Sequence, residues 1–356
     1  MTVKKLQQLT GHNAAVYAIA EGTSSEKIFS GGGEGWIVEW DLSKPNTGKL
    51  IATVPDSIFS LYFDAAAQTI YAGDKSGGLH TIGTDALRMV TYQKNHRKGI
   101  YQIFSDGKDL FTCGGDGVLT RYIGKNLENY ESIQLSQKSL RSICLLADAV
   151  LCVGASDGNI YFLEKNTLEL LYTRKNAHAD SVLSLAAQDN FLVSGGKDAH
   201  LKIWTSDFGR WKLDVGKNTL DFGLWTLDKE QNITREEYIF PKSDVQRPMF
   251  NFQSPTSEIA AHLSAIYAIA FHLTEKKIFA TASRDKTIKI WEINLESESP
   301  ENTFQLLKVI NTIKNGGHIR SVNNLMWRND GTLVSVGDDS TLIVWDINSQ
   351  VIKPKL

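Results

Sequence analysis

The chain has 356 residues with 38 basic and 40 acidic side chains, so its formal charge is −2, and the two signs are interspersed. This balance of charges argues against a nucleic-acid binder, although it does not exclude a basic patch on one face. The N-terminal residues lack the apolar core of a signal peptide and no stretch stays apolar for about 18 residues, so we expect a cytoplasmic protein without a membrane-spanning segment.

A pattern of about 42 residues recurs along the chain. Each complete copy holds a histidine before an aliphatic residue, then a hydroxyl, an acid and an aromatic residue at fixed spacings. The first copy has His12, Ser30, Glu34 and Trp40, with the longer acid glutamate in the third place. The aliphatic residues that anchor the seven copies stand at positions 16, 58, 100, 140, 182, 266 and 322.

The later copies differ in how much of the pattern they keep. The second and fourth copies, around Ile58 and Leu140, keep only the apolar skeleton and a glycine-bearing turn. The third copy is complete except that a phenol replaces the indole: His96, Thr112, Asp116 and Tyr122. The last three copies are fully kept: His178, Ser194, Asp198 and Trp204; His262, Thr281, Asp285 and Trp291; His318, Ser335, Asp339 and Trp345.

The sixth copy shows what a repeat is built from. Residues 266–271 and 278–282 are apolar runs of strand length, and 283–286 form a polar turn. Residues 287–291 then alternate polar and apolar side chains, as a half-buried strand does. Three antiparallel strands of this size cannot bury both faces alone, so each repeat needs neighbours to stack on.

Gly-His and Trp-Asp pairs mark the ends of several copies. Gly11-His12, Gly317-His318, Trp40-Asp41 and Trp345-Asp346 resemble the signatures of the WD-repeat β-propeller family. The resemblance implies one all-β domain over residues 1–356, a seven-bladed β-propeller of four-stranded antiparallel blades. Because 42% of the residues are hydrophobic, the chain can bury a large core, and we expect it to fold without a cofactor. The resemblance also implies that each set of His, Ser/Thr, acid and aromatic residue is a structural tetrad, and that residues 3–9 supply the last outer strand and close the ring.

One long segment breaks the rhythm of the repeats. Residues 206–257 form an excess between the fifth and sixth copies, with too many large aromatic side chains for a solvated linker. We expect a β-hairpin extension or flap there. The alternative is a degenerate eighth blade, against which Pro241 and Pro248 argue. A smaller excess near residues 294–303, rich in Glu, Ser and Pro, is typical of a mobile loop.

The recurring Ser, His and Asp could be mistaken for catalytic chemistry, since acyl transfer uses these three residue types. An enzyme needs one such site, whereas a repeat scaffold needs the same brace in every unit, so we predict no catalytic residue. No metal site is predicted, because five of the eight histidines belong to the repeats and no Cys-x-x-Cys pair exists. Cys144 and Cys152 face each other across a predicted hairpin, yet we expect all three cysteines to be buried free thiols.

The residues that indicate a function are those expected where the central channel of the propeller opens. In the resembled family, the residue after the inner-strand aliphatic and the residue before the turn acid face one side of the ring, where partners dock. The partner-binding residues that this implies are Tyr17, Phe59, Lys75, Tyr101, Arg141, Lys197, Tyr267 and Arg284. Aromatic residues and arginine dominate interface hot spots, and the basic residues suit a peptide with acidic side chains. The alternative is that the aromatics only line the ring wall.

We therefore expect a non-catalytic protein-protein interaction scaffold that binds a protein or peptide partner at the channel mouth. One alternative is a constitutive subunit of a multiprotein assembly, docked through residues 206–257. Another is an enzyme or small-ligand receptor that uses the channel mouth, which would need convergent acids or a metal set that the sequence does not show.

Overall fold

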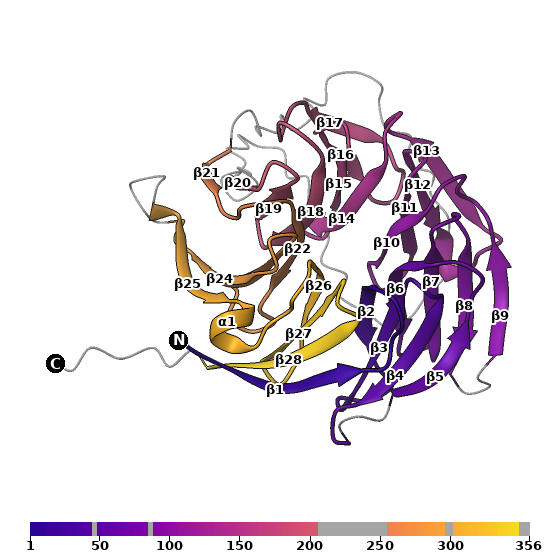
Figure 1. Ribbon diagram of the computed structural model, residues 1–356. Coiled ribbons are helices and arrows are strands. Elements are labelled where there is room, and N and C mark those ends of the chain that lie inside the picture. The colour runs from indigo at the N-terminus through magenta and orange to yellow at the C-terminus, as the bar shows by residue number, and fades with distance from the viewer. Residues whose placement is uncertain (45–47, 85–87, 206–254, 296–301, 349–356) are drawn as a thin grey trace, which may run out of the picture.

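The computed structural model describes residues 1–44, 48–84, 88–205, 255–295 and 302–348. In these ranges the strands form seven four-stranded antiparallel sheets, which are arranged as blades around a central axis (Figure 1). The predicted seven-bladed propeller is therefore confirmed. The blades are numbered below in chain order, starting with the sheet that contains Val16.

Within each blade the first strand lies at the central channel and the other strands follow outward. Blade one contains β2 (Val16–Glu21), β3 (Lys27–Gly32), β4 (Trp36–Asp41) and β5 (Gly48–Thr53). Blade two contains β6 (Ile58–Asp64), β7 (Thr69–Asp74), β8 (Leu79–Gly83) and β9 (Arg88–Gln93). Blade three contains β10 (Ile100–Ser105), β11 (Leu110–Gly114), β12 (Val118–Tyr122) and β13 (Tyr130–Gln134). Blade four contains β14 (Leu140–Leu146), β15 (Val150–Ala155), β16 (Ile160–Glu164) and β17 (Leu170–Arg174).

The remaining blades follow the same plan. Blade five contains β18 (Val182–Gln188), β19 (Phe191–Gly196), β20 (His200–Thr205) and β21 (Ser257–Ala260). Blade six contains β22 (Ile266–Phe271), β23 (Ile278–Ser283), β24 (Ile288–Ile293) and β25 (Phe304–Ile310). Blade seven contains β26 (Val322–Trp327), β27 (Thr332–Gly337), β28 (Thr341–Asn348) and β1 (Thr2–Thr10). The connections hold a 3₁₀ turn, η1 (Ile123–Lys125), and one short helix, α1 (Thr312–Asn315). Across the described ranges, no helix has the length and apolar character that a membrane crossing requires.

The second strand of a blade is buried on both faces. Every residue of β15, β19 and β23 is buried, because each blade is sandwiched between two others. Their sequences are accordingly runs of small and apolar residues, without the alternation of a sheet that faces water on one side. The hydrophobic clusters join neighbouring blades, and one of them contains both Phe162 of blade four and Trp204 of blade five.

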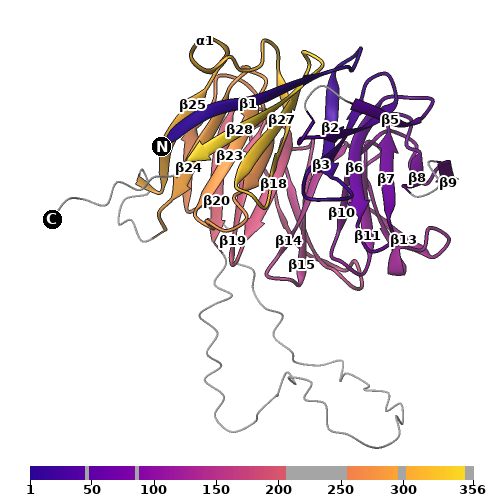
Figure 2. The ribbon, with the colours of Figure 1, turned by 90° about the horizontal axis from the view of Figure 1, so that it is seen from below.

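The N-terminal strand closes the ring. Strand β1 pairs antiparallel with β28, the third strand of blade seven, with Leu9 opposite Leu342 (Figure 2). Leu9 is fully buried and belongs to a cluster that joins blade seven to blade one. The predicted closure by residues 3–9 is thus confirmed, with a strand one residue longer at each end.

The strand that follows the long segment between blades five and six belongs to a different blade than the repeat spacing predicts. Ser257–Ala260 pairs with β20, so these residues are the outer strand of blade five rather than the start of blade six. The predicted hairpin, flap or eighth blade would fall in residues 206–254, outside the described ranges. Thr205 and Thr256, which flank that segment, approach each other at 2.7 Å between their hydroxyl oxygens.

Candidate functional site

The inner strand of every blade carries a β-bulge at the same place. In all seven blades the register between the first and second strands slips directly after the first aliphatic residue. A bulge leaves one extra residue unpaired and re-aims its side chain. The seven bulged residues are Tyr17, Phe59, Tyr101, Arg141, Leu183, Tyr267 and Asn323.

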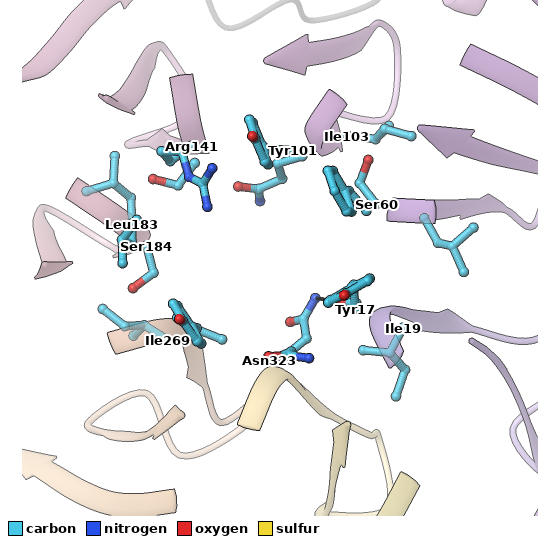
Figure 3. A pocket seen from close by; sticks show the side chains of 18 of the residues that line it. Tyr17, Ile19, Ser60, Tyr101, Ile103, Arg141, Leu183, Ser184, Ile269 and Asn323 are labelled. Atoms are coloured by element: carbon cyan, nitrogen blue, oxygen red, sulfur yellow. Dashed lines mark hydrogen bonds between the residues drawn. The ribbon is translucent and has the colours of Figure 1, made fainter. Parts of the chain in front are cut away.

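All seven bulged residues line one cavity of about 660 Å³ at the end of the central channel, here called the channel mouth. Figure 3 shows five of them, Tyr17, Tyr101, Arg141, Leu183 and Asn323, grouped around the opening. Polar side chains from the next position of the inner strands also line it: Ser60, Gln102, Ser142, Ser184 and Asn324. A ligand that enters the mouth would therefore meet a side chain from every blade.

Four bulged residues on consecutive blades form one continuous stack. The rings of Tyr17 and Phe59 meet edge to face at 5.4 Å, and those of Phe59 and Tyr101 lie parallel at 5.5 Å. The guanidinium of Arg141 follows, with its carbon 3.8 Å from the centre of the Tyr101 ring. Such a stack is already packed before any ligand arrives, so the mouth is largely preformed on this side.

The opposite side of the mouth is polar and joins the last blade to the first. Asn323 Nδ2 donates to the carbonyl of Val16 at 2.9 Å and to Asp338 Oδ1 at 2.8 Å. Burial, followed by the nearby charge of Asp338, raises the pKa of Tyr17, so this phenol stays protonated. The seam where the ring closes is thus held by hydrogen bonds at the mouth.

The three basic residues expected at the mouth, Lys75, Lys197 and Arg284, do not line the cavity. Each lies in the turn between the second and third strands, where its backbone N–H donates at 2.8–3.0 Å to the carbonyl just before the inner strand. This bond fixes the turn beside the mouth and leaves the side chain exposed. Lys197 Nζ pairs with Asp180 at 3.0 Å. The structure therefore places the three residues on an outer rim, separate from the stack.

The tetrad of blade six is fully assembled. Trp291 Nε1 donates to Thr281 Oγ1 at 2.9 Å, and this oxygen lies 2.7 Å from His262 Nε2. His262 Nδ1 lies 2.9 Å from Asp285 Oδ2. An imidazole that donates from Nδ1 to a carboxylate accepts at Nε2, so the hydroxyl donates to the ring and accepts from the indole. The same arrangement joins the tetrads of blades five and seven: His178, Ser194, Asp198 and Trp204, and His318, Ser335, Asp339 and Trp345.

The two tetrads that depart from the pattern are also brought together. In blade one His12 bonds Glu34 and Ser30, and Trp40 Nε1 donates to Ser30 Oγ at 2.7 Å. The longer glutamate thus reaches the imidazole.

In blade three His96 lies 2.8 Å from Thr112 and 3.1 Å from Asp116. Tyr122 is fully buried where the other blades have an indole, and Asn95 Nδ2 donates to its hydroxyl at 3.3 Å.

The protonation states of the tetrads follow from their burial. Burial lowers the pKa of His262, so its ring is neutral at pH 7. Burial by itself would raise the pKa of Asp198, but the hydrogen bond and charge of His178 outweigh it and lower that pKa to about 2. The hydroxyls at the centres of the five tetrads have no exposed surface. In four blades they are engaged by both imidazole and indole, so they are not placed to attack a substrate.

The two weaker repeats contain polar braces that the sequence spacing did not indicate. In blade two the side chains of Asp74 and His80 are buried and pair at 2.7 Å. In blade four Asp157 Oδ2 accepts from the hydroxyls of Ser136 and Tyr161, both at 2.6 Å. Asp74 and His80 do stand six residues apart, the spacing of acid and aromatic residue in the other copies, but shifted along the repeat. A search for that spacing in any register would have found them.

The cysteines lie inside strands of blades three and four. All three are buried and free, and burial raises the pKa of Cys113 to about 12. Cys144 and Cys152 face each other directly across the pair β14 and β15, as the hairpin pattern predicts. Over the described ranges, no three His, Cys, Asp or Glu side chains gather as metal ligands would.

Comparison with known proteins places this architecture in a family. A family model described as WD domain, G-beta repeat matches residues 3–41, 168–205, 253–292 and 307–346. Nuclear distribution protein PAC1 of Candida glabrata is 30% identical over 353 residues, which cover 88% of this chain and 69% of that protein. The chain belongs to the WD40 repeat family.

Other matches support the fold and leave the partner open. The WD40 β-propeller domain of Doa1 superposes with a TM-score of 0.73 over 98% of both chains at 14% identity, which is a likeness of fold alone. Actin-interacting protein 1 of Caenorhabditis elegans is 24% identical over 95% of this WD40 chain, and mouse striatin is 22% identical over 57% of it. The chain spans 47% of the length of the first and 30% of the second.

Proposed function

We propose that this WD40 chain is a non-catalytic interaction scaffold that binds a segment of a protein partner at the channel mouth. The observation that supports this most strongly is the convergence of all seven bulged residues on one preformed cavity. Rigid aromatic side chains and arginine are the residue types that dominate protein interfaces, and five of the seven belong to these types. Actin-interacting protein 1, which is similar to 95% of this chain, is named for binding a protein.

An enzyme or small-ligand receptor at the mouth receives less support. Among the described residues that line the cavity, Asp338 is the one carboxylate, and there is no histidine. Asp338 accepts a hydrogen bond from Asn323, so it is not paired with a second acid for general acid-base work. The imidazole and hydroxyl groups of the tetrads lie inside the blades.

Capture with mouth variants tests the proposal. Phe59→Ala should remove the central ring of the stack and weaken partner capture, because both neighbouring rings lose their contact. The matched control is Leu273→Ala, which removes an exposed leucine between β22 and β23 at the other end of the inner strand. Quantitative mass spectrometry of proteins retained from the native host should find a set kept by the wild type and the control but lost with Phe59→Ala. Equal retention by all three, with unchanged thermal unfolding, would refute binding at the mouth.

A further inference from the structure

Arg141 is the one basic side chain among the described residues that line the channel mouth. Its guanidinium lies on the Tyr101 ring at 3.8 Å, so one planar face is covered. A guanidinium stacked in this way still has its N–H groups at the edge of the plane, where they match a carboxylate. Within the described part of the chain, those N–H groups form no hydrogen bond and no ion pair.

A second unused donor lies beside Arg141. Ser142 has 3% of its surface exposed, lines the same cavity, and has a buried Oγ without a hydrogen-bond partner. The equivalent hydroxyls in two other blades do have partners. Ser60 Oγ donates to the carbonyl of Ile100 at 3.1 Å, and Ser184 Oγ donates to that of Ile266 at 3.5 Å. A buried hydroxyl without a partner is costly, so its place next to an unpaired arginine points to an acceptor supplied from outside.

The rim next to Arg141 adds positive charge. Lys75, Arg97, Lys98 and Lys138 are exposed in the connections and turns of blades two to four, and none of them forms an ion pair within the described residues. Several acids on this side of the blades are already engaged by other groups. Asp56 is bonded by Ser57 and Ser76, Asp116 by His96, and Asp157 by Ser136 and Tyr161, while Asp180 pairs with Lys197. The four cations of this rim therefore have no acidic partner within the described residues.

From this we infer that the mouth contains a carboxylate subsite at Arg141 and Ser142, which takes an acidic side chain or the C-terminal carboxylate of a partner protein segment. The inference rests on the proposed function and specifies which chemical group of the partner is bound. The carboxylate would accept from the edge of Arg141 and from Ser142 Oγ, while further acids of the segment lie along the basic rim of blades two to four.

The aromatic stack favours a protein segment over single-stranded nucleic acid. Proteins that bind single strands leave ring faces open so that bases can stack on them. Here Phe59 and Tyr101 cover each other at an angle of 7° between their planes, and Arg141 lies over Tyr101. Both faces of the Tyr101 ring and one face of the Phe59 ring are thus already occupied, and the free polar groups beside them are donors suited to carboxylates.

Fluorescence polarisation with defined probes tests the subsite. The probes are a labelled glutamate-rich peptide, its counterpart with glutamine at each glutamate, and a labelled oligothymidylate. The wild type should bind the glutamate peptide more tightly than the glutamine peptide. Arg141→Gln should weaken the glutamate peptide about ten-fold or more, since charge-assisted hydrogen bonds are lost. Lys108→Gln is the control, because it removes an exposed charge from the other end of blade three.

Two further variants keep the test decisive. Arg141→Lys retains the charge but not the planar edge, so it should bind more weakly than the wild type even if Arg141→Gln unfolds. Ser142→Ala should reduce affinity without lowering the melting temperature, because the free protein loses no hydrogen bond. Equal binding of the two peptides by the wild type, unchanged binding by Arg141→Lys, or tighter binding of oligothymidylate would overturn the inference. If Phe59→Ala loses its partners while the Arg141 variants keep them, the subsite fails and the proposed function stands.

Discussion

In the tetrads, one buried hydroxyl is matched on its donor and its acceptor side by side chains of the same blade. Thr281 lies between Trp291 and His262, and the charge of Asp285 holds the imidazole in one tautomer. At the mouth the situation is reversed, because Arg141 and Ser142 have donors without acceptors in the described chain. The hydroxyl of the blade-six tetrad is thus satisfied on both sides, whereas Ser142 Oγ in the wall of the mouth has no partner within the described residues.

The acid of a tetrad should stabilise the fold in a pH-dependent way. Asp198 accepts hydrogen bonds from His178 Nδ1 and from two backbone N–H groups, of Ala179 and His200. We expect Asp198→Ala to lower the free energy of unfolding by about 1–3 kcal/mol at pH 7, because these donors lose their acceptor. The exposed Glu26→Gln is the control and should change little. Chemical denaturation of the three proteins measures the difference.

The pH dependence of that difference has a definite sign. The pKa of Asp198 is lowered from 3.8 to about 2 in the folded protein, so the folded state binds a proton less readily than the unfolded state. Its contribution is therefore fully present above about pH 4 and is lost as the pH falls towards about 2. The gap between wild type and Asp198→Ala should narrow over this range. A gap that stays constant, or no loss of stability at pH 7, would contradict the assigned role of Asp198.

At the scale of strands, the sequence predicts those elements that follow from the spacing of residues close together in the chain. The apolar runs of β22 and β23, the turn between them and the tetrad positions recur at fixed distances along the chain, so the blade could be recognised from composition and period. The closing strand β1 was predictable because a blade that lacks its outer strand leaves an unpaired edge.

Other features depend on register or on contacts between blades, which one sequence does not contain. The slip after Ile100 turns Tyr101 and its counterparts toward the channel, but the residues themselves are compatible with regular pairing. For the same reason the spacing predicts that blade six begins near Glu258, whereas β21 pairs with β20 of blade five across a long interruption. The position of Lys197 and Arg284 in the repeat predicts that they lie at the mouth, whereas the turn geometry leaves their side chains exposed on the rim.

Because β1 closes the ring, two leucines of this strand should contribute very differently to the free energy of unfolding. Leu9 is fully buried between blade seven and blade one, whereas Leu6 is 46% exposed. Leu9→Ala should cost about 2–5 kcal/mol of unfolding free energy, as large-to-small changes in a core do. Leu6→Ala should cost far less. Thermal and urea unfolding measure both, and similar losses for the two variants would show that β1 does not close the ring as described.

At the scale of the whole molecule, the seven bulges give the mouth its character. Each blade contributes one bulged side chain. The tetrads and the second strands stabilise the blades, so the fold does not require one residue type at the bulged positions. The bulged residues of blades one to four form a stack of aromatic rings and arginine, whereas a hydrogen-bonded seam joins blades seven and one. The mouth is therefore chemically asymmetric although the ring is nearly symmetric.

The long segment in blade five leads to a prediction about the whole assembly. The two ends of the segment are held together, because Thr205 and Thr256 are hydrogen-bonded and Thr256 N donates to the carbonyl of Ile203 at 2.8 Å. A variant in which residues 206–254 are replaced by a short glycine-containing turn should therefore fold into the same ring, with a melting temperature close to that of the wild type. Partner capture at the mouth should persist, since the mouth lies at the start of the inner strands while the segment follows the end of β20. Light scattering after size exclusion checks the molecular mass of both proteins. A loss of oligomers or of mouth-independent partners on deletion would instead favour a constitutive subunit docked through this segment, and a variant that fails to fold would show that the ring depends on it.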